Sequence, residues 1–186
     1  MINVGEVRKG INIELEGQLF TVVEFEHIKM GRGGAVVRLK LRNLRSGYTA
    51  ERTFPASEKF RRAYLERSKV QYQYAEDDLL YFMNTETFEQ VALSREQLAS
   101  EIPYLKENTV VDLLGYQGDP IGIELPITLE LRVTQTDPGF KGDTATGGTK
   151  PAILETGVRV NVPLFVNPGD VLKIDTRSGD YIERVY

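Results

Sequence analysis

The residues best suited to chemistry in this chain gather in one short glycine-rich segment. Residues 29–34 read KMGRGG, so three glycines flank a single arginine, Arg32. Glycine allows backbone conformations that other residues avoid, and it lets the backbone approach a partner closely. A guanidinium on such a thin turn has no core to pack against; it stays charged and can grip phosphate or stack on a base. The segment therefore predicts a binding probe, and the alternative is a flexible surface turn with an incidental arginine.

The predicted strand that follows supports the first interpretation. Its apolar face consists of Ala35, Val37, Leu39 and Leu41. Its other face carries Arg38, Lys40 and Arg42, and this period of two is typical of a half-buried antiparallel strand. A basic surface would then extend from the strand to Arg32. We expect these three cations to contact a phosphate backbone.

A second candidate segment is the long polar, glycine-rich stretch 136–151. Its glycine spacing superficially resembles a phosphate-binding Walker loop, but Gly148 lies where that motif needs a lysine, which argues against nucleotide hydrolysis. Long loops without secondary structure are usually functional or disordered. Lysines here remain candidates for phosphate contact. The candidate residues of this loop are Lys141, Gly142, Asp143, Thr144, Gly147, Gly148 and Lys150.

Few other residues offer catalytic or metal-binding chemistry. The chain has no cysteine and one histidine, His27, which leaves no thiolate, no sulfur ligand and no histidine-rich metal site. No G-x-S-x-G nucleophile motif occurs, and acidic pairs such as Asp77 and Asp78 lie in predicted turns. We therefore expect no enzymatic activity, no metal and no cofactor. His27 is predicted to pack or to form hydrogen bonds.

Charge is distributed unevenly along the chain. Residues 1–63 contain 12 basic and 7 acidic residues, residues 64–127 contain 4 and 12, and residues 128–186 contain 7 and 8. A basic block beside a strongly acidic block indicates separate modules. The basic block is the candidate for contact with phosphate, although solubility alone also explains such clustering.

Short strands separated by turn residues dominate the sequence, which predicts an all-β fold. Their spacing favours small barrels or sandwiches, in three blocks with boundaries near residues 63 and 127. Short helical segments are predicted only at residues 57–64 and 95–100. No apolar run is long enough to span a membrane and the first residues contain no apolar leader, so we expect a cytoplasmic protein.

Two stretches resemble the elongation factor P family of bacterial translation factors, which is homologous to the hypusine-bearing factor of eukaryotes and archaea. The stretch HIKMGRGGAVVRLKLRNLRSG, followed by ERTF, resembles the family's first domain. The stretch that begins TDPGFKGD and continues through KPAILETG to VNVPLFVNPGD resembles its C-terminal domain. The resemblance implies an SH3-like (KOW-like) domain over residues 1–63 and oligonucleotide-binding (OB) type barrels over residues 64–127 and 128–186. It also implies an elongated, L-shaped arrangement that mimics tRNA.

The resemblance further implies a role in translation. Such a factor binds the 70S ribosome, through rRNA and ribosomal proteins, between the P and E sites and beside the P-site peptidyl-tRNA. There it relieves stalling at consecutive prolines. Arg32 occupies the tip position that faces the peptidyl-transfer centre and that many members modify, which implies a modifying enzyme as a partner. The rest of the tip loop is Lys29, Gly31, Gly33 and Gly34.

The C-terminal loop is implied to approach the small subunit and the E-site mRNA. The family also implies a monomer that acts away from membranes. Two other functions fit the same residues. A paralogue that resembles elongation factor P would share the barrels but rescue other stalled sequences. A generic RNA-binding β module would bind free RNA strongly and in a salt-sensitive way, against which the net charge of −4 argues.

Overall fold

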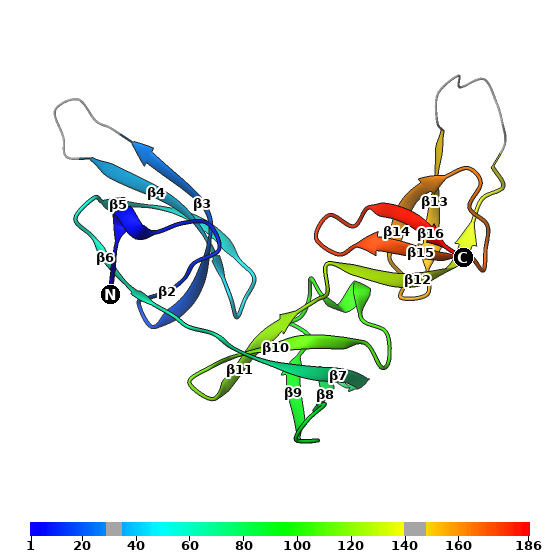
Figure 1. Cartoon of the computed structure of the whole chain (residues 1–186), viewed down its shortest axis with the longest axis horizontal. Coiled ribbons are helices and arrows are strands. Elements are labelled where there is room, and N and C mark those ends of the chain that lie inside the picture. The colour runs from blue at the N-terminus through cyan, green and yellow to red at the C-terminus, as the bar shows by residue number, and fades with distance from the viewer. Residues whose placement is uncertain (29–34, 140–147) are drawn as a thin grey trace. The chain divides into compact units, whose positions relative to one another are not determined.

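Three antiparallel β-sheets make up nearly all of the described protein (Figure 1). The computed structural model describes residues 1–28, 35–139 and 148–186. Within those ranges, helical structure is confined to two 3-10 turns, η1 (Val4–Glu6) and η2 (Ile102–Tyr104). The predicted all-β fold class is therefore confirmed.

The N-terminal sheet has six strands in the hydrogen-bonded order β1-β6-β2-β3-β4-β5. The strands are β1 (Ile2–Asn3), β2 (Asn12–Leu15), β3 (Gln18–Ile28), β4 (Val36–Asn43), β5 (Thr49–Pro55) and β6 (Lys59–Arg62). The hairpin of β3 and β4 is its longest pairing, from Phe20 opposite Asn43 to Ile28 opposite Val36. Residues 29–34, which join these two strands, lie outside the described residues.

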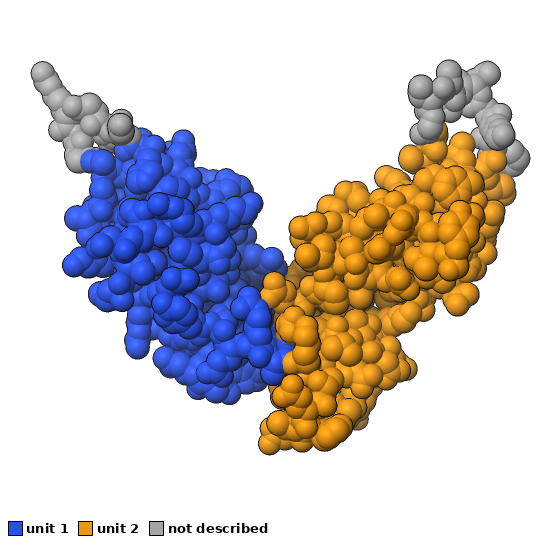
Figure 2. Space-filling view, in the orientation of Figure 1, with its two compact units in different colours: residues 1–68, 93–97, 113–122 blue, residues 69–92, 98–112, 123–186 orange. Residues whose placement is uncertain are grey.

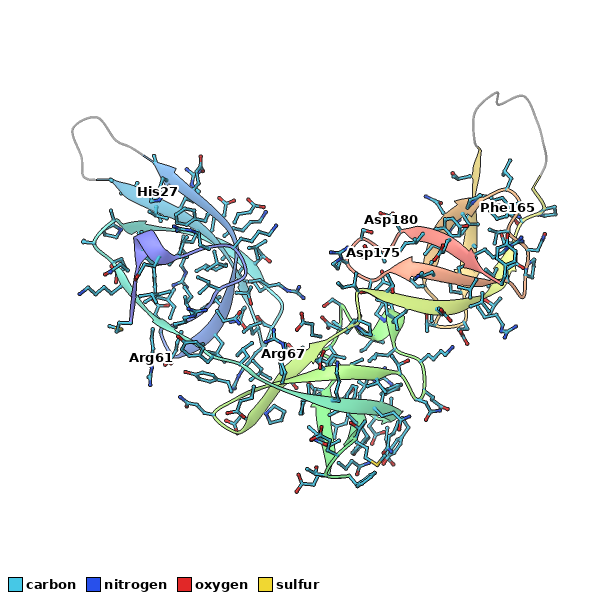
Figure 3. All side chains as sticks on the ribbon, viewed as in Figure 1. His27, Arg61, Arg67, Phe165, Asp175 and Asp180 are labelled. Atoms are coloured by element: carbon cyan, nitrogen blue, oxygen red, sulfur yellow. The ribbon has the colours of Figure 1, made fainter. Side chains whose placement is uncertain are left out.

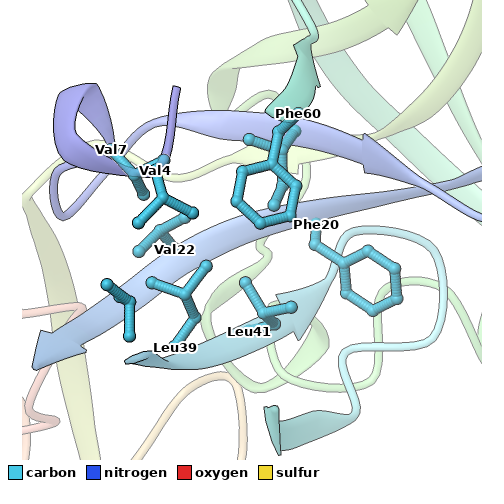
Figure 4. Packing of buried hydrophobic residues seen from close by; sticks show 9 residues of the cluster. Val4, Val7, Phe20, Val22, Leu39, Leu41 and Phe60 are labelled. Carbon is cyan, nitrogen blue, oxygen red and sulfur yellow. The ribbon is translucent and has the colours of Figure 1, made fainter. Parts of the chain in front are cut away.

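The core of this sheet follows from the alternation in β4. Leu39 and Leu41 are fully buried, and Figure 4 shows them across the core from Val4 and Phe60. Burial of each such side chain contributes roughly 1.5–3 kcal/mol relative to leaving it exposed. The predicted inward face of β4 is therefore confirmed for the residues that lie within the strand.

One of the two predicted helical segments is a strand. Residues 57–64 contain β6, which pairs with β2 through Arg62 opposite Ile13 and Arg61 opposite Glu14. The prediction was wrong because Phe60 must enter the core while its neighbours Lys59 and Arg61 remain exposed, and this alternation is a strand period.

The other predicted helix, at residues 95–100, forms only turns. Its predicted cap is present, because the Ser94 backbone N–H donates to Gln97 Oε1 at 3.0 Å and the Gln97 N–H donates to Ser94 Oγ at 3.2 Å. An isolated stretch this short does not offset the cost of helix nucleation. The chain continues instead into η2.

The other two sheets each have five strands, in the orders β11-β10-β7-β8-β9 and β14-β13-β12-β15-β16. The central strands are β7 (Glu66–Glu76), β8 (Leu79–Asn84), β9 (Gln90–Ser94), β10 (Val110–Tyr116) and β11 (Asp119–Glu124). The C-terminal strands are β12 (Thr128–Thr136), β13 (Thr149–Leu154), β14 (Arg159–Pro163), β15 (Val171–Asp175) and β16 (Tyr181–Val185). The C-terminal sheet buries its own apolar cluster, which includes Leu131, Val162 and Ile174.

By its internal contacts the chain divides into two compact units, coloured blue and orange in Figure 2. Unit 1 comprises residues 1–68, 93–97 and 113–122. Unit 2 comprises residues 69–92, 98–112 and 123–186. Unit 1 therefore contains the whole N-terminal sheet and most of the β10–β11 hairpin. The three-domain division at residues 63 and 127 stays a prediction.

A small hydrophobic seam joins the N-terminal sheet to the β10–β11 hairpin within unit 1. Leu19, Ala63 and Ile121 are buried there. The partly buried residues around them are Leu44, Leu65, Leu114 and Tyr116. At its edge the Tyr116 hydroxyl donates a hydrogen bond of 3.0 Å to Glu14 Oε2. The hairpin is therefore packed as part of the N-terminal body.

Candidate nucleic-acid interface

The β3–β4 hairpin positions the predicted tip, although the tip itself is outside the described residues. Arg32, Lys29, Gly31, Gly33 and Gly34 all belong to the segment that joins the strands. Near the end of β3, the ring of His27 meets Phe25 edge-on, with centroids 4.6 Å apart and an interplanar angle of 85° (Figure 3). This contact with Phe25 is a packing contact, as predicted for His27.

The exposed cations of β4 have acidic partners on the neighbouring strand. Lys40 Nζ lies 3.0 Å from Glu24 Oε1, and Arg38 Nη1 lies 3.6 Å from Glu26 Oε2. The strand register places each of these pairs directly opposite, and Glu51 of β5 lies on the other side of Lys40. The hydrogen bond to Glu24 and its charge raise the pKa of the Lys40 ammonium. The face of β4 is therefore a surface of mixed charge rather than the purely basic one that its own sequence suggests.

The ion pairs do not prevent these cations from binding phosphate. Arg42, the third cation of the face, lies opposite Thr21 and Thr49. Exposed ion pairs typically contribute only about 0–1 kcal/mol, so a phosphate can replace a carboxylate at little cost. Contact of Arg38, Lys40 and Arg42 with nucleic acid stays a prediction.

A hollow of about 500 Å³ lies beside these ion pairs, lined in part by Arg8, Lys9 and Phe25. The Arg8 guanidinium lies 5.7 Å from the centroid of the Phe25 ring and donates to the carbonyl oxygens of Gly5 and Val7, each at 2.7 Å. Arg8 is thus held in place by the N-terminal turn. The hollow mixes both signs of charge and offers no purely cationic pocket for an anion.

The C-terminal loop is held at its base by contacts within unit 2. Lys150 is only 6% exposed, and its ammonium donates a hydrogen bond of 2.7 Å to the carbonyl oxygen of Asp137. A Cβ atom on Gly139 would lie 2.3 Å from the carbonyl oxygen of Leu164, so that position requires glycine. Lys150 therefore anchors the loop rather than presenting its charge to solvent.

Only the base of this loop can be placed. Gly148 directly precedes β13, on which Lys150 lies. The other predicted loop residues lie outside the described ranges: Lys141, Gly142, Asp143, Thr144 and Gly147.

A set of exposed residues that the sequence analysis missed lies on β6 and just after it. The guanidinium of Arg62 lies 4.9 Å from the centroid of the Tyr64 ring, and Tyr64 is 71% exposed. Arg61 forms an ion pair of 3.5 Å with Glu14, and Lys59 is exposed (Figure 3 labels Arg61). The sequence analysis missed these residues because it predicted a helical turn at residues 57–64. The alternation of Lys59, Phe60 and Arg61 is nevertheless a detectable strand signal.

Among the residues that the structure describes, no group of three or more histidine, aspartate or glutamate side chains is arranged to hold a metal ion. Residues 1–28, 35–139 and 148–186 also contain no helix that is long and apolar enough to cross a membrane.

Comparison with known proteins gives matches along almost the whole chain. The elongation factor P KOW-like domain matches residues 3–60, the elongation factor P OB domain matches residues 65–123, and the elongation factor P C-terminal domain matches residues 129–184. Elongation factor P of Moorella thermoacetica is 56% identical over 184 residues, which cover 99% of this chain and 100% of that protein. The chain belongs to the elongation factor P family.

Other members of the elongation factor P family agree with this assignment. The protein of Acetivibrio thermocellus is 52% identical over 185 residues, with full coverage of both chains. A solved structure of translation initiation factor 5A from Methanococcus jannaschii superposes with a TM-score of 0.51 at 22% identity, over 67% of this chain and 93% of that chain, which shows a shared fold. The protein is a translation elongation factor by family, and its relatives are named as translation factors rather than as enzymes.

Proposed function

We propose that this factor binds the 70S ribosome between the P and E sites and steadies the P-site peptidyl-tRNA, so that stalling at consecutive prolines is relieved. The observation that carries the proposal is full-length similarity to elongation factor P proteins, combined with an arginine in the glycine-rich segment that joins β3 and β4. In this proposal Arg32 faces the peptidyl-transfer centre.

The chemistry suits a factor that brings no catalytic group. The ribosome forms the peptide bond, and a bound protein assists by holding the substrate near its reactive geometry. Preorganisation of this kind removes part of the entropic barrier, and each ~1.4 kcal/mol is a tenfold change in rate. A guanidinium suits this task because it stays protonated and binds phosphate through two parallel hydrogen bonds.

Several finer features belong to the same proposal. We place SH3-like, OB-type and OB-type domains at residues 1–63, 64–127 and 128–186, which is supported by three family matches that begin and end close to those limits. In this proposal the protein acts in the cytoplasm as a monomer. Its further partners are rRNA, ribosomal proteins and E-site mRNA. An enzyme that modifies Arg32 is an additional partner, to be sought by the intact mass of protein from its native cell.

The test is translation in vitro of a message that encodes consecutive prolines. Wild-type protein should relieve the stall, and Arg32→Ala should remove most of that relief without changing the circular dichroism spectrum. Arg159→Ala, which removes an exposed arginine of β14, is the matched control and should retain activity.

No relief by the wild-type protein would exclude the proposed function. Relief only at stalls without consecutive prolines would indicate the paralogue. Unfolding of Arg32→Ala would show that the arginine supports the fold instead of acting as a probe.

A further inference from the structure

We propose that the end of β6 and the residue that follows Ala63 form a second RNA-contact surface on the N-terminal sheet, made of Arg62 and Tyr64. The inference rests on the proposed ribosomal function and adds to it a surface separate from Arg32 and from the face of β4. We call these two residues the β6 surface. Its ligand is the sugar–phosphate backbone of RNA, with one base or sugar against the tyrosine ring.

The first observation is the state of the charges. Among the described residues, Arg62 forms no ion pair with a carboxylate, whereas Arg38 and Lys40 of β4 each do. Phosphate contact releases counterions and is the main source of affinity for RNA. The Arg62 guanidinium can make that contact from its place beside the Tyr64 ring without first giving up an ion pair.

The second observation is the way in which the tyrosine is held in solvent. Its neighbours Ala63 and Leu65 both point into the seam within unit 1, and the Ala63 N–H donates a hydrogen bond of 2.9 Å to the carbonyl oxygen of Asn12. The backbone on both sides is therefore fixed, so Tyr64 must face outwards. A large ring that is 71% exposed contributes little to the core and is available to a partner.

The third observation is the pairing of this ring with a guanidinium. Arg62 lies 4.9 Å from the ring centroid of Tyr64, so a flat aromatic group and a charge occupy one small area. Arginine and aromatic side chains in this combination bind single strands and RNA loops through stacking and backbone contact. Arg61 is excluded from the β6 surface because Glu14 holds it at the seam.

The experiment compares two variants of the full-length protein that remove the same charge. Arg62→Gln alters the β6 surface, and Arg159→Gln, at an exposed arginine of β14, is the matched control. Affinity for 70S ribosomes that carry initiator tRNA in the P site is measured over a range of salt concentrations. Loss of one phosphate contact should reduce the slope of log affinity against log salt by about 0.7–0.9. The control should leave the slope unchanged.

A third variant and a cross-link separate RNA from protein as the partner. Tyr64→Ala should weaken binding about 5-fold to 150-fold, as expected for loss of one stacked base, with an unchanged salt slope. Ultraviolet irradiation of the wild-type complex should attach a nucleotide to the peptide that contains Tyr64. This measurement needs no variant and does not depend on how the substitutions affect folding.

Three results would overturn the inference. Arg62→Gln keeps the wild-type slope, Arg62→Gln and Arg159→Gln change the slope equally, or the cross-link at Tyr64 joins a ribosomal protein. If the wild-type protein does not bind ribosomes at all, the proposed function fails together with the β6 surface. If the wild-type protein binds and only the variants disagree, the inference alone fails.

Discussion

At the scale of single residues, the burial of a charged side chain and its hydrogen-bond partner decide what that side chain does. Lys150 and Lys59 are both lysines on strands, but Lys150 is 6% exposed and bonded to the Asp137 carbonyl, whereas Lys59 is exposed. The sequence predicted Lys150 as a loop cation, because composition does not reveal which lysine turns inward. Fully buried lysines are rare unless their ammonium has a partner. Here the partner is a backbone carbonyl oxygen. Every residue has such an oxygen, so the sequence does not indicate this partner as it would indicate a carboxylate.

Lys150 can be tested by a substitution that keeps its shape. Lys150→Met preserves most of the apolar volume but cannot donate to the Asp137 oxygen. We expect the free energy of unfolding to fall by about 1–3 kcal/mol, measured by urea titration followed by circular dichroism. Arg159→Met, on an exposed site of the adjacent strand, should change it by less than about 0.5 kcal/mol. Equal effects of the two substitutions would contradict the anchoring role.

Asp175 gives a prediction for pH. Its carboxylate accepts hydrogen bonds from the Arg177 guanidinium, at 2.6 Å and 3.1 Å, and from the Arg177 backbone N–H at 2.9 Å. These bonds lower the pKa of Asp175 to about 2. The unfolded chain, with an ordinary aspartate pKa of about 3.9, binds this proton more readily than the folded protein does. The contribution to stability is therefore complete above about pH 4 and is lost as pH falls through about 2.

Carbon-detected NMR titration of the Asp175 carboxyl checks this value. We expect a midpoint near pH 2 in the wild-type protein and a return towards the ordinary aspartate range in Arg177→Gln. An unchanged midpoint in that variant would show that the guanidinium is not the cause.

At the scale of elements, the seam is the feature that sequence reasoning did not find. Alternation along β4 predicted which face is buried, because each residue's side depends only on its neighbours in the strand. The packing of Ile121 against Leu19 and Ala63 depends on which elements meet in space, and no local period encodes it. Strand β6 was missed for a related reason, since residues 57–64 suit a turn until Phe60 is seen to fill a core built by other strands.

The hydrogen bond at the edge of the seam can be measured by a double-mutant cycle. Tyr116→Phe removes the hydroxyl that donates to Glu14, a bond that also raises the pKa of this tyrosine. We expect faster amide hydrogen exchange in residues 113–122, because the bond no longer holds the hairpin against the N-terminal sheet. Combination with Glu14→Gln should change exchange by less than the sum of the two single effects.

The matched control for this cycle is Tyr48→Phe, because Tyr48 is 69% exposed and belongs to the same unit. It should leave hydrogen exchange in residues 113–122 unchanged. Additive effects of Tyr116→Phe and Glu14→Gln would mean that the bond contributes nothing to the seam.

At the scale of the whole molecule, charge and fold were easier to predict than the site. The all-β class, the family and the basic first block all follow from patterns that extend over many residues, so single errors do not alter them. The predicted basic face of β4 has mixed charge in the structure. Glu24 and Glu26 belong to another strand, and only the register places them beside Lys40 and Arg38. The charge of a surface is therefore a property of the sheet rather than of one strand.

The division into units has a consequence for synthesis of the chain. The N-terminal sheet ends at residue 62, but its seam is completed by residues 113–122. Domains generally fold as the chain emerges, N-terminal parts first. A nascent chain that has exposed only the first sheet still lacks Ile121, so Leu19 and Ala63 face solvent until about twice as much chain has emerged. The N-terminal body of this translation factor thus reaches its final form only after the ribosome has made most of the central sheet as well.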